Sequence, residues 1–115
     1  CAPDHPISIL QIHGLEDDTV PYDGASWSLS IPAVMEYWLT SNSCDPEPLS
    51  VITDLEDGSY ILSDSYQNCS NNVGVELILH STMGHTWPSI DNHSLSATEQ
   101  IWAFFAKYDI NGTIN

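Results

Sequence analysis

Two apolar runs, far apart in the sequence, have the character of buried β-strands. The first covers residues 7–12 and lies between Pro6 and Gly14, and the second covers residues 73–79. Most positions in both runs are apolar, which is typical of a strand that is covered on both faces. The pattern therefore predicts two buried strands of the kind found in parallel sheets.

A helical pattern follows each strand after a polar loop. Between residues 31 and 39 the apolar residues recur at i, i+3, i+4, i+7 and i+8, with Ser30 as a suitable N-cap. This spacing predicts a helix from residue 31 to about residue 42. Ser96 and Glu99 form a capping box that predicts the start of a second helix. The helical stripes are expected to place four large aromatic residues in the core: Trp38, Trp102, Phe104 and Phe105.

A β-hairpin is predicted between these two strand-and-helix units. Residues 49–55 and 59–66 are strand-like and meet at the turn sequence Asp57-Gly58. Strand, helix, hairpin, strand and helix, in this order, are typical of a parallel α/β sheet from which the hairpin is an excursion. Because two such strands make a poor sheet by themselves, further strands are expected upstream of Cys1.

The charge of the chain limits its partners. Its 115 residues include sixteen Asp or Glu and a single Lys, Lys107, which gives a net charge of −15. Nucleic-acid binding depends on Lys and Arg contacts to phosphate, so no nucleic-acid partner is expected, and an anionic membrane surface is disfavoured for the same reason. No apolar run reaches the length of about 18 residues that a membrane-spanning helix needs.

Chemically active groups gather in the two loops that follow the predicted strands. The first loop holds the neighbouring carboxylates Glu16, Asp17 and Asp18, and the second loop holds His85. Since adjacent parallel strands end at the same edge of a sheet, a carboxylate of the first loop can orient His85 as a general base. His13, which precedes the glycine of the first loop, is expected to close the strand end by hydrogen bonding.

Two other groups of residues carry side chains that can bind metal ions. A set in the second half of the chain does not match the spacing of a zinc site: His80, His85, Asp91 and His93. The segment from Asp109 to Gly112 begins like a calcium loop but lacks the later acidic ligands. No metal or cofactor is therefore expected, and residues 109–115 are interpreted as a tail or the start of a linker.

Five motifs occur in a specific order along the chain: H-G-x-x-D-x-x-V-P-Y at 13–22, W-x-x-x-N-x-C at 38–44, Y-x-x-C at 66–69, G-H-T-W-P at 84–88 and A-T-E-x-I-W-A-F-F at 97–105. In this order they resemble the C-terminal half of a family of secreted serine esterases with the α/β-hydrolase fold, the polyhydroxybutyrate depolymerases and the feruloyl and related carbohydrate esterases. The resemblance extends from about Pro6 to Tyr108. The chain departs from the family at residues 81–83 and at Ser89, where the family is rich in glycine.

The resemblance implies a catalytic triad in the chain order Ser, Asp, His. It assigns the acid to Asp17, in preference to Asp18 and Glu16, and the general base to His85. Trp87 is then either a packing residue or a wall of the substrate pocket.

The resemblance also pairs Cys44 with Cys69 in a disulfide. Such a bond is typical of an oxidising compartment, so the protein is expected to be secreted, extracellular or periplasmic. Cys1 would pair with a cysteine in another part of the protein.

The nucleophile of the triad is not found in the sequence. The nearest match to G-x-S-x-G, residues 24–28, lacks the final glycine, and there is no glycine-rich oxyanion loop. Residues 1–108 are therefore expected to be the C-terminal part of an α/β-hydrolase catalytic domain whose nucleophile half is missing. A base has nothing to activate without its serine, so the chain alone is expected to be inactive.

The full-length protein is expected to be a serine carboxylesterase that uses no cofactor. Its substrate would be a neutral ester: a polyhydroxyalkanoate, a feruloylated or acetylated polysaccharide, or a small ester. The alternative is a noncatalytic extracellular binding module on a hydrolase-like fold, which would keep the core stripes and lose the triad geometry.

Overall fold

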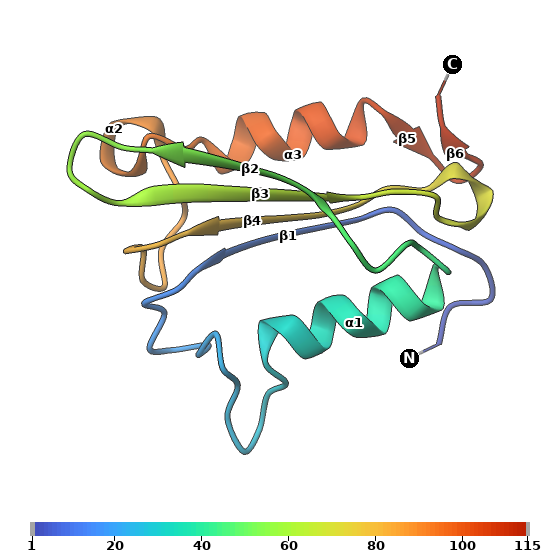
Figure 1. Cartoon of the computed structure of the whole chain (residues 1–115), viewed down its shortest axis with the longest axis horizontal. Helices are drawn as coiled ribbons and strands as arrows, with labels where there is room; N and C mark the ends of the chain where they lie inside the picture. Colours follow the sequence, from blue (N-terminus) through green and yellow to red (C-terminus); the bar gives the residue numbers. More distant parts are fainter. Residues whose placement is uncertain (1, 115) are drawn as a thin grey trace.

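Two parallel strands, β1 (Ile9–Gly14) and β4 (Val75–His80), lie side by side in the sheet (Figure 1). The structure, a computed structural model, describes residues 2–114, so the pairing expected for Cys1 lies outside the described residues. β4 is the more buried of the two strands, and its apolar residues alternate between the two faces of the sheet. β1 begins and ends two residues later than the apolar run predicts, because its pairing with β4 continues to Gly14 and His80.

The predicted hairpin is present, but it is part of the same sheet. β2 (Leu49–Asp54) and β3 (Tyr60–Tyr66) pair in antiparallel fashion on either side of the turn at Asp57-Gly58. β3 also pairs antiparallel with β4, which gives a four-stranded mixed sheet in the order β1-β4-β3-β2. The hairpin is therefore the continuation of the sheet and not an excursion from it.

The predicted fold class, the C-terminal portion of an α/β-hydrolase built from parallel strands that alternate with helices, is wrong. The fold is small and rich in sheet, with one parallel strand pair, a four-stranded mixed sheet, a separate two-stranded sheet and few helices among residues 2–114. The physical reason lies in β4, which has two hydrogen-bonding edges. β1 occupies one edge in parallel, and the hairpin occupies the other in antiparallel fashion.

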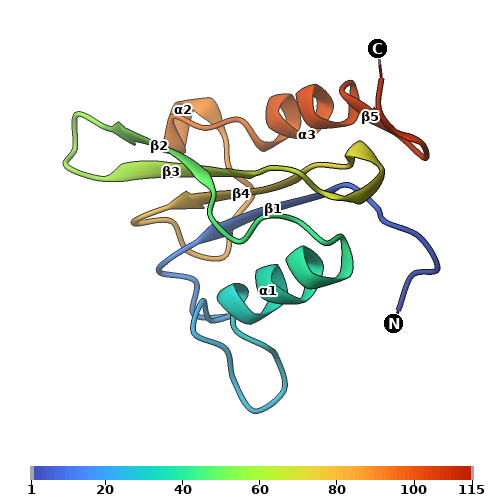
Figure 2. The same ribbon diagram turned by 45° about the vertical axis from the view of Figure 1, so that its right-hand side comes forward.

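One helix covers each face of the sheet at the β1 end (Figures 1 and 2). α1 (Ile31–Ser41) packs on the face that carries Val75 and Leu77, where Met35 joins their apolar cluster. α3 (Ala97–Phe105) contacts β1 on the other side, where Ile78 belongs to a second apolar cluster. β1 therefore has a helix on each of its faces.

Both predicted helix starts are confirmed. The Ser30 hydroxyl accepts a hydrogen bond from the Ala33 amide at 3.2 Å, and the Ser96 hydroxyl accepts one from the Glu99 amide at 3.3 Å. Side chains of this type satisfy amides that have no partner within the first turn of a helix. Beyond the C-terminal end of α1, the buried Asn42 side chain donates to the Ile7 carbonyl at 2.8 Å and anchors the segment that leads into β1.

The prediction that four aromatic residues lie in the core is wrong for two of them. Phe104 is buried and Trp38 is half-buried, but Trp102 is 76% exposed and Phe105 is 63% exposed. α3 packs on β1 with only one side of the helix, so the part of its apolar stripe that carries Trp102 and Phe105 remains outside the core. Phe105 faces the open space beside β1.

Short elements complete the chain. α2 (Ile90–His93) lies within the long loop after β4, and a single 3₁₀ turn covers Ser70–Asn72. The segment interpreted as a tail forms a small hairpin of β5 (Tyr108–Asp109) and β6 (Gly112–Thr113). The predicted disulfide between Cys44 and Cys69 is confirmed, with its sulfur atoms 2.04 Å apart.

Candidate active site

The first loop folds around the carboxylate of Asp17. The Asp17 Oδ1 atom accepts hydrogen bonds from the amides of Thr19 at 2.9 Å and Val20 at 2.8 Å. Asp side chains stabilise turns in this way when they bond to the backbone two or three residues ahead. The local turn therefore fixes one carboxylate oxygen and leaves the other, Oδ2, to point out of the loop.

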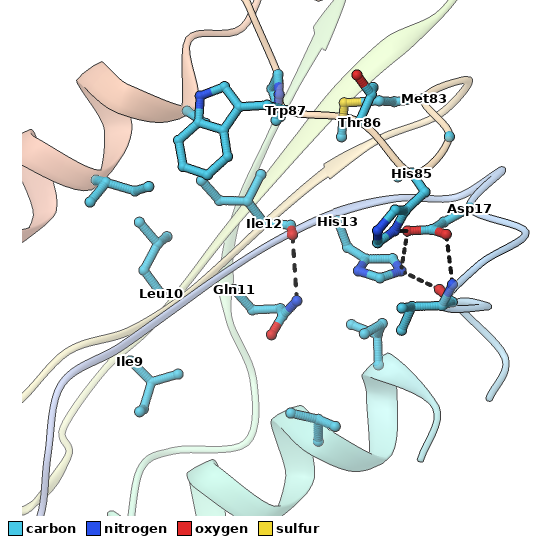
Figure 3. Close-up of a pocket in the computed structure, with 18 of the residues that line it drawn as sticks. Ile9, Leu10, Gln11, Ile12, His13, Asp17, Met83, His85, Thr86 and Trp87 are labelled. Carbon is cyan, nitrogen blue, oxygen red and sulfur yellow. Dashed lines mark hydrogen bonds and ion pairs between the residues drawn. The ribbon is translucent and has the colours of Figure 1, made fainter. Parts of the chain in front are cut away.

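His85, from the second loop, meets that second oxygen. Its Nδ1 atom lies 3.0 Å from Asp17 Oδ2, and the two residues are 68 positions apart in the sequence (Figure 3). A carboxylate can only accept here, so Nδ1 carries the proton and Nε2 of the neutral ring has a free lone pair. The structure thus brings together the two residues for which the sequence predicts an acid and base pair.

The two side chains differ greatly in exposure. The Asp17 side chain is 5% exposed, whereas the His85 side chain is 55% exposed. Among residues 2–114, no hydrogen bond is found at His85 Nε2. The pair therefore consists of a buried, fixed carboxylate and an imidazole whose second nitrogen is open to an incoming group.

The hydrogen bonds of Asp17 lower its pKa. Burial by itself raises the pKa of this carboxyl, but hydrogen bonds from the Val20 amide, from His85 and from the Thr19 amide outweigh that effect. The pKa of Asp17 consequently lies below its ordinary value of 3.8. At neutral pH the residue is a carboxylate, which is the form that can orient an imidazole and stabilise an imidazolium.

Neighbouring parallel strands and a glycine bring the two loops together. β1 and β4 end in register at Gly14 and His80, and beyond them the Glu16 amide donates to the Met83 carbonyl at 3.1 Å. A Cβ atom on Gly14 would lie only 2.0 Å from the Met83 carbonyl oxygen. The close approach of the loops therefore requires glycine at residue 14.

His13 closes the end of β1, as the sequence predicts. Its Nε2 atom lies 2.8 Å from the carbonyl oxygen of Val20 and 3.6 Å from Asp17 Oδ2. The buried imidazole thus holds the far side of the loop whose amides bind Asp17. His13 supports the position of the carboxylate without being part of the pair itself.

The competing carboxylates lie outside the pair. Glu16 and Asp18 are exposed, and the only partner found for either side chain within the described residues is the Thr19 hydroxyl, 3.5 Å from Asp18 Oδ1. Asp17 is therefore the carboxylate of this loop that contacts His85.

An apolar hollow of about 1030 Å³ opens beside the pair. It runs along β1 and ends at Asp17 and His85, with walls from α1 on one side and α3 on the other (Figure 3). Trp87 lines it near His85 with most of its side chain exposed, an arrangement that suits a pocket wall better than a packing residue.

Sequence reasoning missed two features of this region. Ser28 lines the hollow, and its hydroxyl is buried without a hydrogen-bond partner in the described structure, although nothing in its sequence context marks it. His80 is buried at the end of β4, where its Nε2 atom lies 3.1 Å from the His93 carbonyl oxygen and its Nδ1 atom accepts from the Thr82 amide. A histidine directly after the apolar residues 77–79 was the available signal for His80.

Residues 2–114 contain no group of three or more His, Cys, Asp or Glu side chains placed to hold a metal ion. Within the same part of the chain, no helix combines the length and apolarity needed to span a lipid bilayer.

No protein-family model matches the chain, and no curated protein matches it either. The geometry of the site is therefore the basis for assigning a function.

Proposed function

We propose that the full-length protein is a serine carboxylesterase in which Asp17 orients His85 and His85 transfers protons. The observation that carries the proposal is the 3.0 Å hydrogen bond from His85 Nδ1 to the buried Asp17 carboxylate, at the end of an apolar hollow. This arrangement leaves Nε2 free to receive a proton on the side that faces substrate.

The proposed reaction uses a serine that this chain does not supply. The serine oxygen attacks the ester carbonyl carbon while its proton passes to His85 Nε2, and Nε2 then returns that proton to the departing alcohol. A water molecule next attacks the carbonyl carbon of the acyl-serine and gives a proton to Nε2, and Nε2 returns this proton to the serine oxygen as the bond from carbon to serine breaks and the acid is released. Asp17 stabilises the imidazolium in both steps.

The hollow favours a neutral substrate with an apolar acyl or alcohol part. Its walls are largely aliphatic and aromatic, and its titratable lining residues are His13, Asp17 and His85. A net charge of −15 disfavours the approach of a polyanion. Short polyhydroxyalkanoates, feruloyl or acetyl esters of polysaccharides and small aliphatic esters all meet these conditions.

A secreted or periplasmic location fits the same proposal. The disulfide between Cys44 and Cys69 is consistent with an oxidising compartment, as found outside the cell and in the periplasm.

The test measures hydrolysis of p-nitrophenyl butyrate by the protein expressed from its complete coding sequence. We expect His85→Ala and Asp17→Asn to reduce kcat by roughly 10⁴, as loss of the base or of its orienting carboxylate does in serine hydrolases. Asp18→Asn and Glu16→Gln are matched controls in the same loop and should retain nearly the full rate.

The isolated 115-residue chain should show no turnover. Labelling with a fluorophosphonate, which reacts with activated serines, should likewise require the complete protein. A complete protein that is neither labelled nor able to hydrolyse any neutral ester would refute the proposal and favour a binding module instead.

A further inference from the structure

Two histidines outside the acid and base pair lie at the two ends of the segment that carries His85. His80 is the last residue of β4, and His93 is the last residue of α2. Their ring centroids are 5.9 Å apart, and the ring planes are nearly perpendicular. The proposed function gives neither of these histidines a role.

Each ring accepts a hydrogen bond from a backbone amide of the loop between them. The Thr82 amide donates to His80 Nδ1 at 3.3 Å, and the Ser89 amide donates to His93 Nδ1 at 3.1 Å. Because an amide N–H can only donate, both Nδ1 atoms must be without a proton. The geometry therefore requires two neutral rings, each with its proton on Nε2.

The two histidines are also joined to each other. His80 Nε2 lies 3.1 Å from the His93 carbonyl oxygen, and since a carbonyl accepts, the Nε2–H group of His80 donates to it. Three hydrogen bonds thus link Thr82 to Ser89 through His80 and His93. His85 lies between these two anchored amides in the sequence.

The imidazole of His93 is the side chain that holds the far end of the loop. Ser89 is the N-cap of α2, but its own side chain makes no cap bond, and its hydroxyl is buried without a partner in the described structure. Elsewhere in the loop, the Met83 and Pro88 carbonyls accept from backbone amides, which do not titrate. Protonation can therefore act on this loop, outside the acid and base pair, through His80 and His93.

A proton on either Nδ1 atom would replace the lone pair by an N–H group that faces the amide N–H, so the hydrogen bond would be lost. Histidine is the side chain that ordinarily changes its charge between about pH 5 and pH 8. Within the described residues, Asp57 at the hairpin turn interacts with His80 through its charge, and the His93 ring faces His80 from α2. Asp91 is the carboxylate of α2 itself.

We propose that His80 and His93 are positioning residues for His85. As neutral rings they fix the two ends of its loop, and protonation of either ring displaces the loop. In acid, activity is then lost for a reason separate from protonation of His85 itself. This last consequence rests on the proposed function, whereas the anchoring of the loop does not.

The first measurement is the tautomer of each ring, by NMR of the protein expressed from its complete coding sequence with ¹⁵N-labelled histidine. At neutral pH, His80 and His93 should carry their proton on Nε2, whereas His85 should carry its proton on Nδ1, opposite Asp17. Spectra of His80→Asn and His93→Asn, each of which lacks one histidine, provide the assignments. A proton on Nδ1 of either neutral ring would overturn the proposal.

The second measurement is hydrogen exchange of the anchored amides as the pH is lowered from about 7.5 to about 5. The protection factors of Thr82 and Ser89 should fall at least about tenfold as the rings take up protons. The amides of Ala33 and Glu99 are matched controls, because they donate to serine hydroxyls, which do not titrate in this range. An equal change at all four amides would contradict the proposal.

Two variants of His93 separate the acceptor from the ring. His93→Ala has no acceptor at any pH, so kcat for ester hydrolysis should fall about tenfold or more as the loop is misplaced. His93→Asn offers a carbonyl oxygen that accepts but does not titrate. It should keep at least about fivefold more activity than His93→Ala, and protection of the Ser89 amide should persist in acid. His5→Ala, at an exposed position, controls for loss of a histidine elsewhere.

The results distinguish this proposal from the proposed function. Equal rates for His93→Ala and His93→Asn would overturn the positioning role, as would Ser89 protection that still falls in acid in His93→Asn. A protein that hydrolyses no ester but shows the expected tautomers and exchange would refute the proposed function and support the anchoring of the loop. Ester hydrolysis by a protein with an Nδ1 proton on neutral His80 or His93 would do the reverse.

Discussion

At the scale of single residues, the site depends on one position that has no side chain. Gly14 lies where the first loop passes the Met83 carbonyl so closely that no Cβ atom fits. At the same point the Glu16 amide donates a hydrogen bond to the Met83 carbonyl, so Gly14 sets the distance between the two loops. The geometry of Asp17 and His85 therefore rests on a residue that takes no part in their chemistry.

Gly14→Ala should lower the free energy of unfolding by about 2 kcal/mol or more, since the added methyl group must displace the backbone of the second loop. The matched control is Gly84→Ala. A Cβ atom on Gly84 would find its nearest neighbour, the Glu16 carbonyl oxygen, at an ordinary 3.7 Å. Urea unfolding measures both variants, and an equal loss of stability would contradict the role given to Gly14.

Asp17 links the site to the stability of the fold in acid. Its pKa is lowered in the folded protein, so its hydrogen bonds contribute fully above the ordinary value of 3.8. As the pH falls from there through the lowered pKa, the unfolded chain takes up the proton first and the contribution is lost.

Asp17→Asn should therefore be less stable than the unaltered protein by about 1–3 kcal/mol at pH 7, with a smaller difference near pH 3. Urea unfolding across this pH range provides the measurement. Asp18→Asn should show little difference at either pH, because its carboxylate is exposed and contacts only the Thr19 hydroxyl in the described structure. A difference for Asp17→Asn that does not change with pH would contradict the assigned cause.

At the scale of secondary-structure elements, signals from neighbouring residues predict where helices and turns begin. They do not predict which strands pair. The caps at Ser30 and Ser96 and the turn at Asp57-Gly58 were predictable, because each acts on residues a few positions away. The pair formed by Asp17 and His85 was predicted from the order of strands and loops and from the family resemblance.

Long-range choices were not predictable from local patterns. β3 pairs with the strand edge of β4 that is free in the assembled sheet. The sequences of β3 and β4 do not by themselves carry that information. The exposure of Trp102 and Phe105 likewise depends on how far the sheet extends beneath α3. A helical stripe shows which residues share a face but not what lies opposite them.

The disulfide stabilises the connection between α1 and the hairpin. Cys44 follows α1, Cys69 follows β3, and 25 positions separate them in the sequence. Replacing both by Ser should cost about 3.5 kcal/mol, because the unfolded chain regains the freedom that the closed loop removes.

Thermal unfolding of the Cys44→Ser, Cys69→Ser double variant tests this value, with the unaltered protein under reducing conditions as a second measurement. The two should agree. A loss below about 1 kcal/mol in both would show that the bond contributes little to the stability of the fold.

At the scale of the whole molecule, the sheet has two unequal edges. β2 is exposed along its whole length, whereas β1 lies along the apolar hollow between α1 and α3. Open strand edges favour pairing with other chains, and proteins commonly oppose this with charge. Here that charge is almost entirely of one sign.

The charge repulsion between copies of this chain is lost as the pH falls to the isoelectric point. The isoelectric point of the sequence is about 4.1, where the net charge vanishes while β1 and β2 are still the two edge strands of the sheet. Light scattering should rise sharply near that pH at micromolar protein and fall again at pH 7. If the solution stays clear at the isoelectric point, something other than charge repulsion keeps the strand edges from pairing with other copies. If the protein precipitates, acid precipitation becomes the simplest assay for a molecule that covers those edges.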